Sequence, residues 1–291
     1  MLSKTKHLLV GLLGIAVIVP LVLAGCGKKE GSNSNDVSVN GDKTLIVATS
    51  GTLYPTSYHD TKGNKLTGFD VEIVRNVAKE MGYKVKFKEL NVDGQLTAVK
   101  TGKADMAAND FGISPQRKKQ FTLSTPYKHS FNSLMVRKSD NSGIHSWADI
   151  KGKKSAGEAG TGYQRLAKQL GAKLVNYDNV SNDVYLRDVK NGKTDFIAND
   201  YYLQKLALAA TPNSGLKLIK NMYFKTTDDG SGVGIIMKKE NTKLDKKVNA
   251  ALAKLKKSGK LAKISKKFYG TDVSKQPKVK ISKTFTIKND N

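Results

Sequence analysis

The sequence contains a single cysteine, Cys26, among its 291 residues. One cysteine excludes an intramolecular disulfide and any pair of cysteines that could hold a metal ion. The HExxH, P-loop and GxGxxG motifs are also missing, which removes the common signals for a zinc hydrolase, a nucleotide-phosphate site and a dinucleotide site. No Ser or Cys nucleophile and acidic partner stand at recognisable spacing from the histidines, which are His7, His59, His129 and His145. We therefore expect no catalytic residue, no metal site and no cofactor.

Negative charge is scarce, with 25 Asp and Glu against 50 Lys and Arg and a net charge of +25. Such a balance suggests nucleic acid as a partner. However, the lysines are spread along the whole chain and no recognised nucleic-acid-binding motif occurs, so we expect no nucleic acid. The charge keeps the protein soluble and would attract anionic wall polymers and lipid headgroups.

One long apolar run, Leu8 to Leu23, stands near the N-terminus. Two lysines precede it and the sequence LAGC at 23–26 ends it. A basic start, a short apolar core and small residues at the end are typical of an export signal, and the run is short for a membrane span, which needs about 20 apolar residues. Its end resembles the lipobox of bacterial lipoproteins. This resemblance implies that residues 1–25 are removed as a lipoprotein signal peptide and that Cys26 carries a diacylglyceryl group.

Residues 26–42 consist mainly of Gly, Ser, Asn, Asp and Lys and have almost nothing to bury. This composition predicts a flexible tether. The anchor implied by the lipobox would hold the mature chain on the extracellular face of a bacterial cell membrane.

The chain from Lys43 to Asp272 alternates between short apolar strands and amphipathic helices. The expected strands cover 45–48, 83–90, 104–108, 174–177 and 195–198. The expected helices cover 68–81, 93–101, 163–170, 181–191, 244–258 and 261–269. Asp70 would be the N-cap of the first helix. Such alternation predicts α/β structure with doubly wound, mainly parallel sheets. Two extended segments, 131–137 and 231–237, predict two crossings of the chain between two similar halves.

The stretch 105–127 suggests a place for an anion. A strand ends at Ala108, a polar loop follows, and Arg117 lies in the first turn after Pro115. Ligands of open α/β sheets collect at the carboxyl ends of strands, and a guanidinium is a permanent, two-pronged donor for a carboxylate. The alternative is a surface arginine in a solvated run with the two lysines that follow it.

Several segments together resemble the family 3 solute-binding proteins, the extracytoplasmic receptors of polar amino-acid ABC transporters. The matching segments are GFDVEIVRNVAKEMG at 68–82, GKADMAAND at 102–110, SPQRKKQFTLSTPY at 114–127, GKTDFIANDYY at 192–202 and LKKSGKLAKISKKFYG at 255–270. The resemblance implies a periplasmic-binding-protein-like clamshell with two lobes, two hinge crossings and a ligand between the lobes. Lobe 1 would comprise 43–132 and 234–272, and lobe 2 would comprise 133–233. The tail, 273–291, could add a β-strand or stay disordered.

The resemblance also implies roles for individual residues. Arg117 stands where the family binds the ligand carboxylate, and Asp200 stands where it binds the ligand ammonium. A zwitterion that leaves water needs both charges met, because an unpaired buried charge is costly. The residues that would support the carboxylate are Gly112 and Ser114 near Arg117, and Thr161 and Gly162 at a helix start, where backbone N–H groups favour anions.

Other positions bear on specificity. Tyr54 could pack on the ligand side chain, but Val92 stands near the place where a second aromatic ring is usual in the family. Asn109 and Asp110 would form the pocket floor, although Asp110 could instead cap its loop without touching the ligand. Two further residues that could face the ligand are Ser50 and Glu158. These positions favour a polar or sulfur-containing L-amino acid, with cystine as one possibility.

We therefore expect a lipid-anchored, monomeric receptor that captures an L-amino acid and delivers it to an ABC importer, made of a membrane permease and a cytoplasmic ATPase. One alternative is a surface adhesin whose basic surface binds matrix or wall polymers. Another is an enzyme on the same clamshell fold, such as a dehydratase, although no general acid or base stands out in the sequence. Salt separates the first two, because adhesion through scattered lysines fades with ionic strength and a buried zwitterion site does not.

Overall fold

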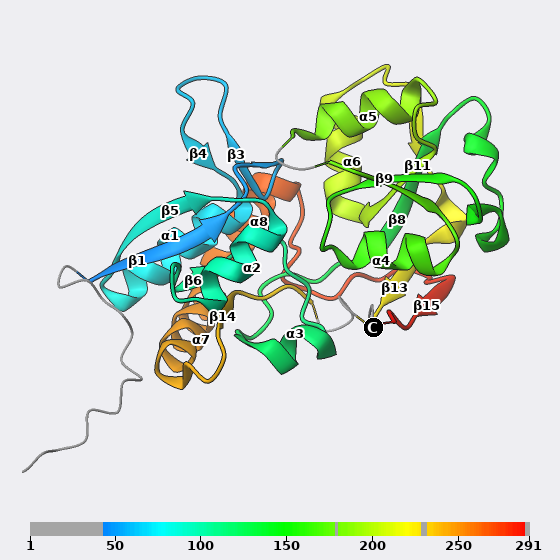
Figure 1. Cartoon of the computed structure of the whole chain (residues 1–291). Coiled ribbons are helices and arrows are strands. Elements are labelled where there is room, and N and C mark those ends of the chain that lie inside the picture. The colour runs from blue at the N-terminus through cyan, green and yellow to red at the C-terminus, as the bar shows by residue number, and fades with distance from the viewer. Residues whose placement is uncertain (1–42, 178–179, 228–231, 289–291) are drawn as a thin grey trace, which may run out of the picture. The chain divides into compact units, whose positions relative to one another are not determined.

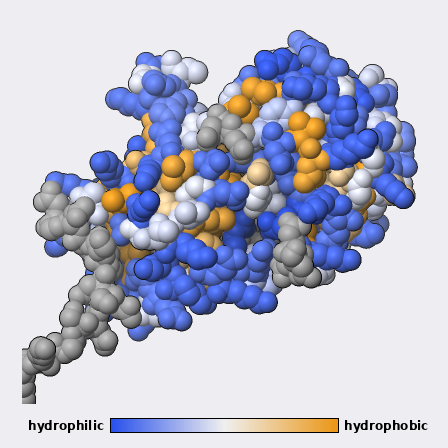
Figure 2. Space-filling model, in the orientation of Figure 1, coloured by the Kyte–Doolittle hydropathy of each residue, from blue (hydrophilic) through white to orange (hydrophobic). Residues whose placement is uncertain are grey.

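The computed structural model describes residues 43–177, 180–227 and 232–288 (Figure 1). The expected signal peptide, Cys26 and the tether over 26–42 lie outside these residues. Among the described helices, none combines the length and apolarity needed to cross a membrane. The face shown in Figure 2 is largely hydrophilic, with apolar side chains in small separate groups. Within the described part of the chain, Leu174 is the one large apolar side chain that is exposed.

The first sheet has five strands in the order β5-β1-β6-β14-β7. The strands are β1 (Thr44–Thr49), β5 (Lys84–Glu89), β6 (Met106–Ala107), β7 (Phe121–Leu123) and β14 (Ile236–Lys238). Both β5 and β6 lie parallel to β1, whereas β14 is antiparallel to β6 and β7. Strand β14 therefore returns the chain to this sheet after it has built a second one.

Helices cover both faces of the first sheet, because successive side chains of a strand point to opposite faces. Leu45 and Val47 of β1 join one core, and Ala48 joins another. The first core is completed by α1 (Phe69–Met81), α7 (Thr242–Lys257) and α8 (Lys260–Tyr269), and the second by α2 (Val92–Lys100). The remaining elements are α3 (Pro115–Gln120) and a small sheet of β2 (Thr52–Leu53), β3 (Ser57–His59) and β4 (Leu66–Thr67).

The second sheet has seven strands, with the order β10-β9-β11-β8-β13-β15 and with β12 beside β8. The strands are β8 (Asn132–Arg137), β9 (Lys154–Gly157), β10 (Lys173–Asn176), β11 (Phe196–Asp200), β12 (Leu216–Leu218), β13 (Phe224–Thr226) and β15 (Lys283–Phe285). Strand β9 is parallel to β10 and β11, whereas β8 is antiparallel to β11, β12 and β13. The strands β9, β10 and β11 are thus parallel to one another, and β8, which brings the chain into this sheet, runs antiparallel to its neighbours.

The second sheet also has a core on each face. Leu134 and Val136 of β8 join one core with α4 (Gly162–Gln169), and Met135 joins the other with α5 (Asn182–Lys190) and α6 (Tyr201–Ala210). Three short 3₁₀ helices complete it, namely η1 (Asn141–Gly143), η2 (Trp147–Ile150) and η3 (Lys220–Met222). The expected two-lobe α/β fold is confirmed, with mixed sheets. The lobe boundaries after residues 132 and 233 stay predictions.

The C-terminal tail contacts both sheets' cores. Val273 is buried in the first core, and its carbonyl accepts a hydrogen bond of 2.7 Å from the His129 N–H. Further along, β15 pairs in parallel with β13, and the Phe285 ring packs on Trp147 with centroids 4.8 Å apart. The tail therefore adds a strand to the second sheet and passes between the sheets a third time, besides the two expected crossings.

The predicted N-cap of the first long helix is wrong. Gly68 holds the cap position with φ 131°, and a Cβ there would lie 2.2 Å from the Thr56 carbonyl oxygen. Asp70 is the second residue of α1 and is fully buried. Its carboxylate accepts a hydrogen bond of 2.7 Å from the Asp110 N–H. Asp70 therefore serves a loop that is distant in the sequence, and not its own helix.

Candidate functional site

A cavity lies where loops from the two sheets meet. The first sheet contributes residues 109–112, which follow β6, and Arg117. The second sheet contributes Asn199 and Asp200 at the end of β11, and residues between 157 and 163 after β9. The cavity holds about 1060 Å³, part of it open to solvent. Its place beyond the carboxyl ends of strands is typical of ligand sites in α/β sheets.

We call one end of the cavity the cationic end; it consists of Phe111, Gly112 and Arg117. Helix α3 carries Arg117, and its N-cap hydroxyl, from Ser114, accepts a hydrogen bond of 3.0 Å from the Arg117 N–H. The guanidinium donates a bond of 2.8 Å to the Gly112 carbonyl and lies 5.2 Å from the centroid of the Phe111 ring. These contacts orient a planar fork of donors, whose geometry suits a carboxylate.

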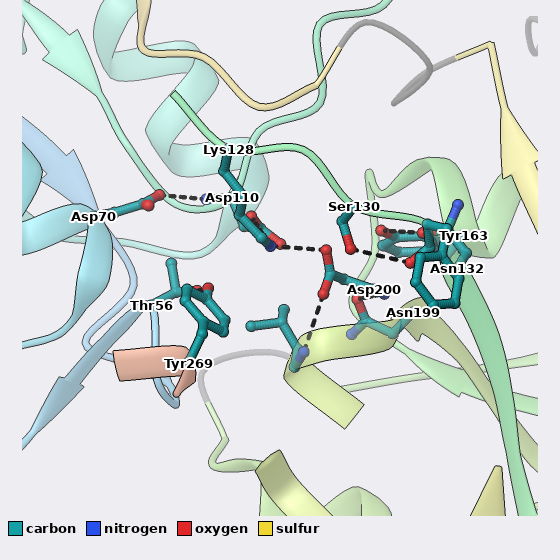
Figure 3. Close-up of polar contacts among 12 residues, drawn as sticks. Thr56, Asp70, Asp110, Lys128, Ser130, Asn132, Tyr163, Asn199, Asp200 and Tyr269 are labelled. Atoms are coloured by element: carbon teal, nitrogen blue, oxygen red, sulfur yellow. Dashed lines mark hydrogen bonds and ion pairs between the residues drawn. The ribbon is translucent and has the colours of Figure 1, made fainter. Parts of the chain in front are cut away.

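We call a second group of residues the acidic end; it consists of Asp110 and Asp200, which line the cavity, and of Asp70 and Lys128, which lie behind them (Figure 3). The Lys128 Nζ lies 2.7 Å from Asp110 Oδ1 and 2.7 Å from Asp200 Oδ2. The Lys128 side chain is 0% exposed. Burial alone would lower the pKa of Lys128, but the charges of Asp110 and Asp200 hold it well above its usual value. A charged lysine therefore joins two carboxylates inside the protein.

Asp70 contacts the backbone of Asp110 (Figure 3). Burial, and then the charge of Asp110, raise the pKa of Asp70 to about 7. Asp70 therefore titrates near neutral pH while it holds the backbone of Asp110 through its N–H. Asp110 has φ 59°, a conformation that Asp and Asn tolerate better than most residues.

Sequence reasoning missed Lys128 and the role of Asp70. Nothing local distinguishes Lys128 from the many other lysines of the chain. Its position comes from tertiary pairing, because Lys128, just before the first crossing segment, forms an isolated antiparallel bridge with Val233 in the second. Asp200 was expected as a ligand contact. It lines the cavity, but its Oδ1 accepts a bond of 3.0 Å from the Leu203 N–H and its Oδ2 meets Lys128.

The expected pocket-floor residues lie close together. Asn109 and Asp110 both line the cavity. Ser50 does not line it, but its hydroxyl donates a hydrogen bond of 2.9 Å to Asn109 Oδ1. Ser50 therefore holds the Asn109 side chain from behind.

The expected helix-start residues also line the cavity. Gly162 begins α4, and Thr161 is its N-cap, with a hydroxyl that accepts a bond of 3.3 Å from the Gln164 N–H. Nearby, Glu158 lines the cavity and accepts a bond of 3.0 Å from the Val92 N–H at the start of α2. A carboxylate is favourable at a helix N-terminus. Glu158 therefore joins the loop after β9 to a helix of the first sheet.

Tyr54 and Ser114 lie away from the cavity wall. Tyr54 packs edge-on against Tyr58 with ring centroids 4.9 Å apart, and its neighbour Leu53 lines the cavity instead. Ser114 acts through the backbone of α3, as its N-cap. Among the described residues, no group of three or more His, Cys, Asp or Glu side chains is arranged to hold a metal ion.

Comparisons with known proteins agree with this architecture. A family model described as bacterial extracellular solute-binding proteins, family 3, matches residues 45–271. The probable ABC transporter extracellular-binding protein YckB of Bacillus subtilis is 48% identical over 88% of this chain and 90% of its own length. The crystal structure of YckB covers 84% of this chain and 96% of its own with a TM-score of 0.65.

A second Bacillus subtilis relative, the L-cystine-binding protein TcyA, is 36% identical over 91% of this chain and 98% of its own length. The family match spans most of the chain, and its members bind solutes. The enzyme alternative is therefore not supported. The chain belongs to the bacterial extracellular solute-binding proteins of family 3.

Proposed function

We propose that this protein captures an L-amino acid in the cavity, with the ligand carboxylate at the cationic end and the ligand ammonium at the acidic end. The observation that carries the proposal is the presence of Arg117 and of the Asp110–Asp200 pair in the lining of one cavity. A zwitterion between them would have both charges met, which offsets the cost of leaving water.

The lining beside the acidic end supports a polar ligand side chain. Ser130, Asn132, Tyr163 and Asn199 line the cavity there, and the Tyr163 hydroxyl donates a bond of 3.1 Å to Asn132 Oδ1. Uncharged donors and acceptors of this kind fix orientation and specificity in pockets. The likeness to a protein named for L-cystine binding makes L-cystine the first compound to test.

Calorimetric titration of the purified protein against the common L-amino acids and L-cystine tests this proposal. We expect tight binding of one or a few of them at physiological salt, with little change when the salt concentration is raised. If no amino acid binds, and a sample unfolded after purification releases none, the proposed function is wrong. Binding to wall polymers that fades steeply with salt would instead favour the adhesin alternative.

We further propose that the protein is a lipid-anchored, monomeric receptor for an ABC importer with a membrane permease and a cytoplasmic ATPase. The LAGC sequence at 23–26 supports the anchor, and the names of the relatives support the importer. The substitution Cys26→Ser should move the protein from the membrane fraction to the medium. Retention of the variant on the membrane would contradict the lipid anchor.

A further inference from the structure

The carboxylate of Asp200 is held by the chain itself. One oxygen caps α6 by accepting a bond of 3.0 Å from the Leu203 N–H, and the other lies 2.7 Å from the Lys128 Nζ. A carboxylate oxygen has two acceptor sites, so a ligand ammonium that reached Asp200 would share an oxygen with Lys128 or with the Leu203 N–H, and the charge of Asp200 would already be offset by Lys128. Asp200 by itself is therefore not the counter-charge for a ligand.

Asp110 presents its carboxylate to the same lysine. Its Oδ1 is 2.7 Å from the Lys128 Nζ, and its side chain is 8% exposed. Asp110 and Asp200 both line the cavity, whereas Lys128 does not. The two acidic residues are therefore in the cavity lining, and the lysine that joins them is outside it.

The charges of the three groups give the reason for this arrangement. Two carboxylates and one ammonium sum to one negative charge, and a bound ligand ammonium would bring the sum to zero. We propose that Asp110 and Asp200 bind the ligand ammonium together and that Lys128 is a positioning residue, which holds the two carboxylates beside each other. This inference rests on the proposed function, because it assumes an amino-acid ligand in this cavity.

Lys128 is needed because the two carboxylates are close and buried. Each lies within 2.7 Å of the same nitrogen, so without that nitrogen their like charges would repel, and one would tend to hold a proton. Among the described residues, the other titratable groups near these three are Asp70 on α1 and the tyrosines Tyr127, Tyr202 and Tyr269. The pKa of Asp70 is about 7, so Asp70 is mostly protonated at pH 6, where the binding constants are compared. Burial raises the pKa of all three tyrosines above the usual value, so they stay neutral and add no charge.

A cycle of three variants tests the charge count. Asp110→Asn keeps an acceptor for Lys128 and tolerates the positive φ, but it makes the three groups neutral. Lys128→Met leaves two carboxylates without their cation, so that one of them would tend to hold a proton, and the double variant leaves the Asp200 carboxylate alone. The probe is L-cystine, or the L-amino acid that the titration finds to bind most tightly, and the readout is the calorimetric dissociation constant.

We expect Asp110→Asn to weaken binding by at least about 10-fold, as loss of a charged partner usually does. We expect Lys128→Met to weaken it as well. In the double variant, the removal of Lys128 should strengthen binding relative to Asp110→Asn alone. Removal of Lys128 should thus weaken binding in the unaltered protein and strengthen binding in Asp110→Asn. Removal of a lysine with a purely structural role would not strengthen binding in either background.

Two results would overturn the inference. One is an Asp110→Asn variant that binds as tightly as the unaltered protein, a result that stands even if Lys128→Met fails to fold. The other is a double variant whose loss equals or exceeds the sum of the single losses. Asp140→Asn is the control, because it removes one carboxylate that pairs with Arg137 outside the cavity lining. If the unaltered protein binds no amino acid, the proposed function fails and this inference fails with it; if it binds and the cycle is additive, only the inference fails.

Discussion

At the cationic end, the seven consecutive residues from Phe111 to Arg117 bring a charge to the cavity, and the Arg117 side chain stays half-buried. At the acidic end, the four charged groups come from α1, from the loop after β6, from the crossing segment before β8 and from the end of β11. There the central charge, on Lys128, has no exposed surface. The two ends differ in how far apart their residues lie in the sequence and in how deeply their charges are buried.

This difference has an energetic consequence. A partly solvated guanidinium loses little hydration, so the fold does not depend on a partner for it. A buried ammonium must be paired, because an uncompensated buried charge costs several kcal/mol. We therefore expect changes at the acidic end to affect both folding and binding, and changes at the cationic end to affect binding almost alone.

The largest expected effect is a pH dependence of stability that comes from Asp70. Its pKa is about 7 in the folded protein, against about 3.9 for an unfolded chain. Between these values the folded state binds more protons, so the free energy of unfolding falls as pH rises from 4 to 7 and then levels off. Asp70→Asn keeps an acceptor for the Asp110 N–H and removes this slope.

Urea unfolding at pH 4 and pH 8 measures the effect. Relative to the unaltered protein, Asp70→Asn should gain up to about 4 kcal/mol of stability between the two pH values, at about 1.4 kcal/mol for each pKa unit. Asp140→Asn is the matched control, because the hydrogen bond from the Ser142 N–H lowers the pKa of Asp140. Relative to the unaltered protein, Asp140→Asn should lose stability between pH 4 and pH 8, which is the opposite sign. If the free energy of unfolding changes equally between pH 4 and pH 8 in Asp70→Asn and in the unaltered protein, the pKa of Asp70 is not raised.

The next effect is the loss of binding in Arg117→Ala. Removing the carboxylate partner should cost about 3 kcal/mol of binding free energy, or roughly 100-fold in affinity. The midpoint of thermal unfolding should change little, because the Arg117 side chain is only half-buried and interactions of partly exposed charges contribute little to stability. Calorimetry and thermal melts measure the two quantities. Lys118→Ala, which removes an exposed charge from the same helix, should change neither quantity. An equal loss of affinity in Lys118→Ala would mean that the ligand responds to the overall positive charge of α3 and makes no specific contact with Arg117.

The contrast between the ends also explains what the sequence could predict. The resemblance and the strand-loop-arginine pattern predicted Arg117, and its contacts with Ser114, Gly112 and Phe111 are with residues a few positions away. The fold class followed in the same way from alternating strands and helices, which are local patterns. Lys128 could not be found, because its two partners are 18 and 72 residues away in the sequence.

Other misses have the same physical origin. Asp70 looks like an N-cap by its position, but its partner is a backbone N–H 40 residues away. Tyr54 follows the first strand as expected, yet it packs on Tyr58, and Leu53 takes the place beside the cavity. The alternating residues of the tail suggested a strand but not its pairing partner, because the edge of β13 forms only when the second sheet folds. For Asp70 and for the tail, the missing information is a long-range contact; Tyr54 is different, because its partner Tyr58 is close to it in the sequence.

The smallest expected effect concerns Ser114, which the family resemblance predicts as a support for the ligand carboxylate although it does not line the cavity. Its hydroxyl caps α3, so Ser114→Ala should cost about 1 kcal/mol of stability. Because α3 carries Arg117, part of that loss should appear in binding, as a decrease in affinity of about 5-fold or less. The matched control is Asn241→Ala, since Asn241 caps α7 by accepting a bond of 3.2 Å from the Leu244 N–H. Both variants should lose similar stability in urea unfolding, and only Ser114→Ala should lose affinity in calorimetry. Equal affinity in the two variants would mean that the contacts with Gly112 and Phe111 hold Arg117 in place without the Ser114 cap.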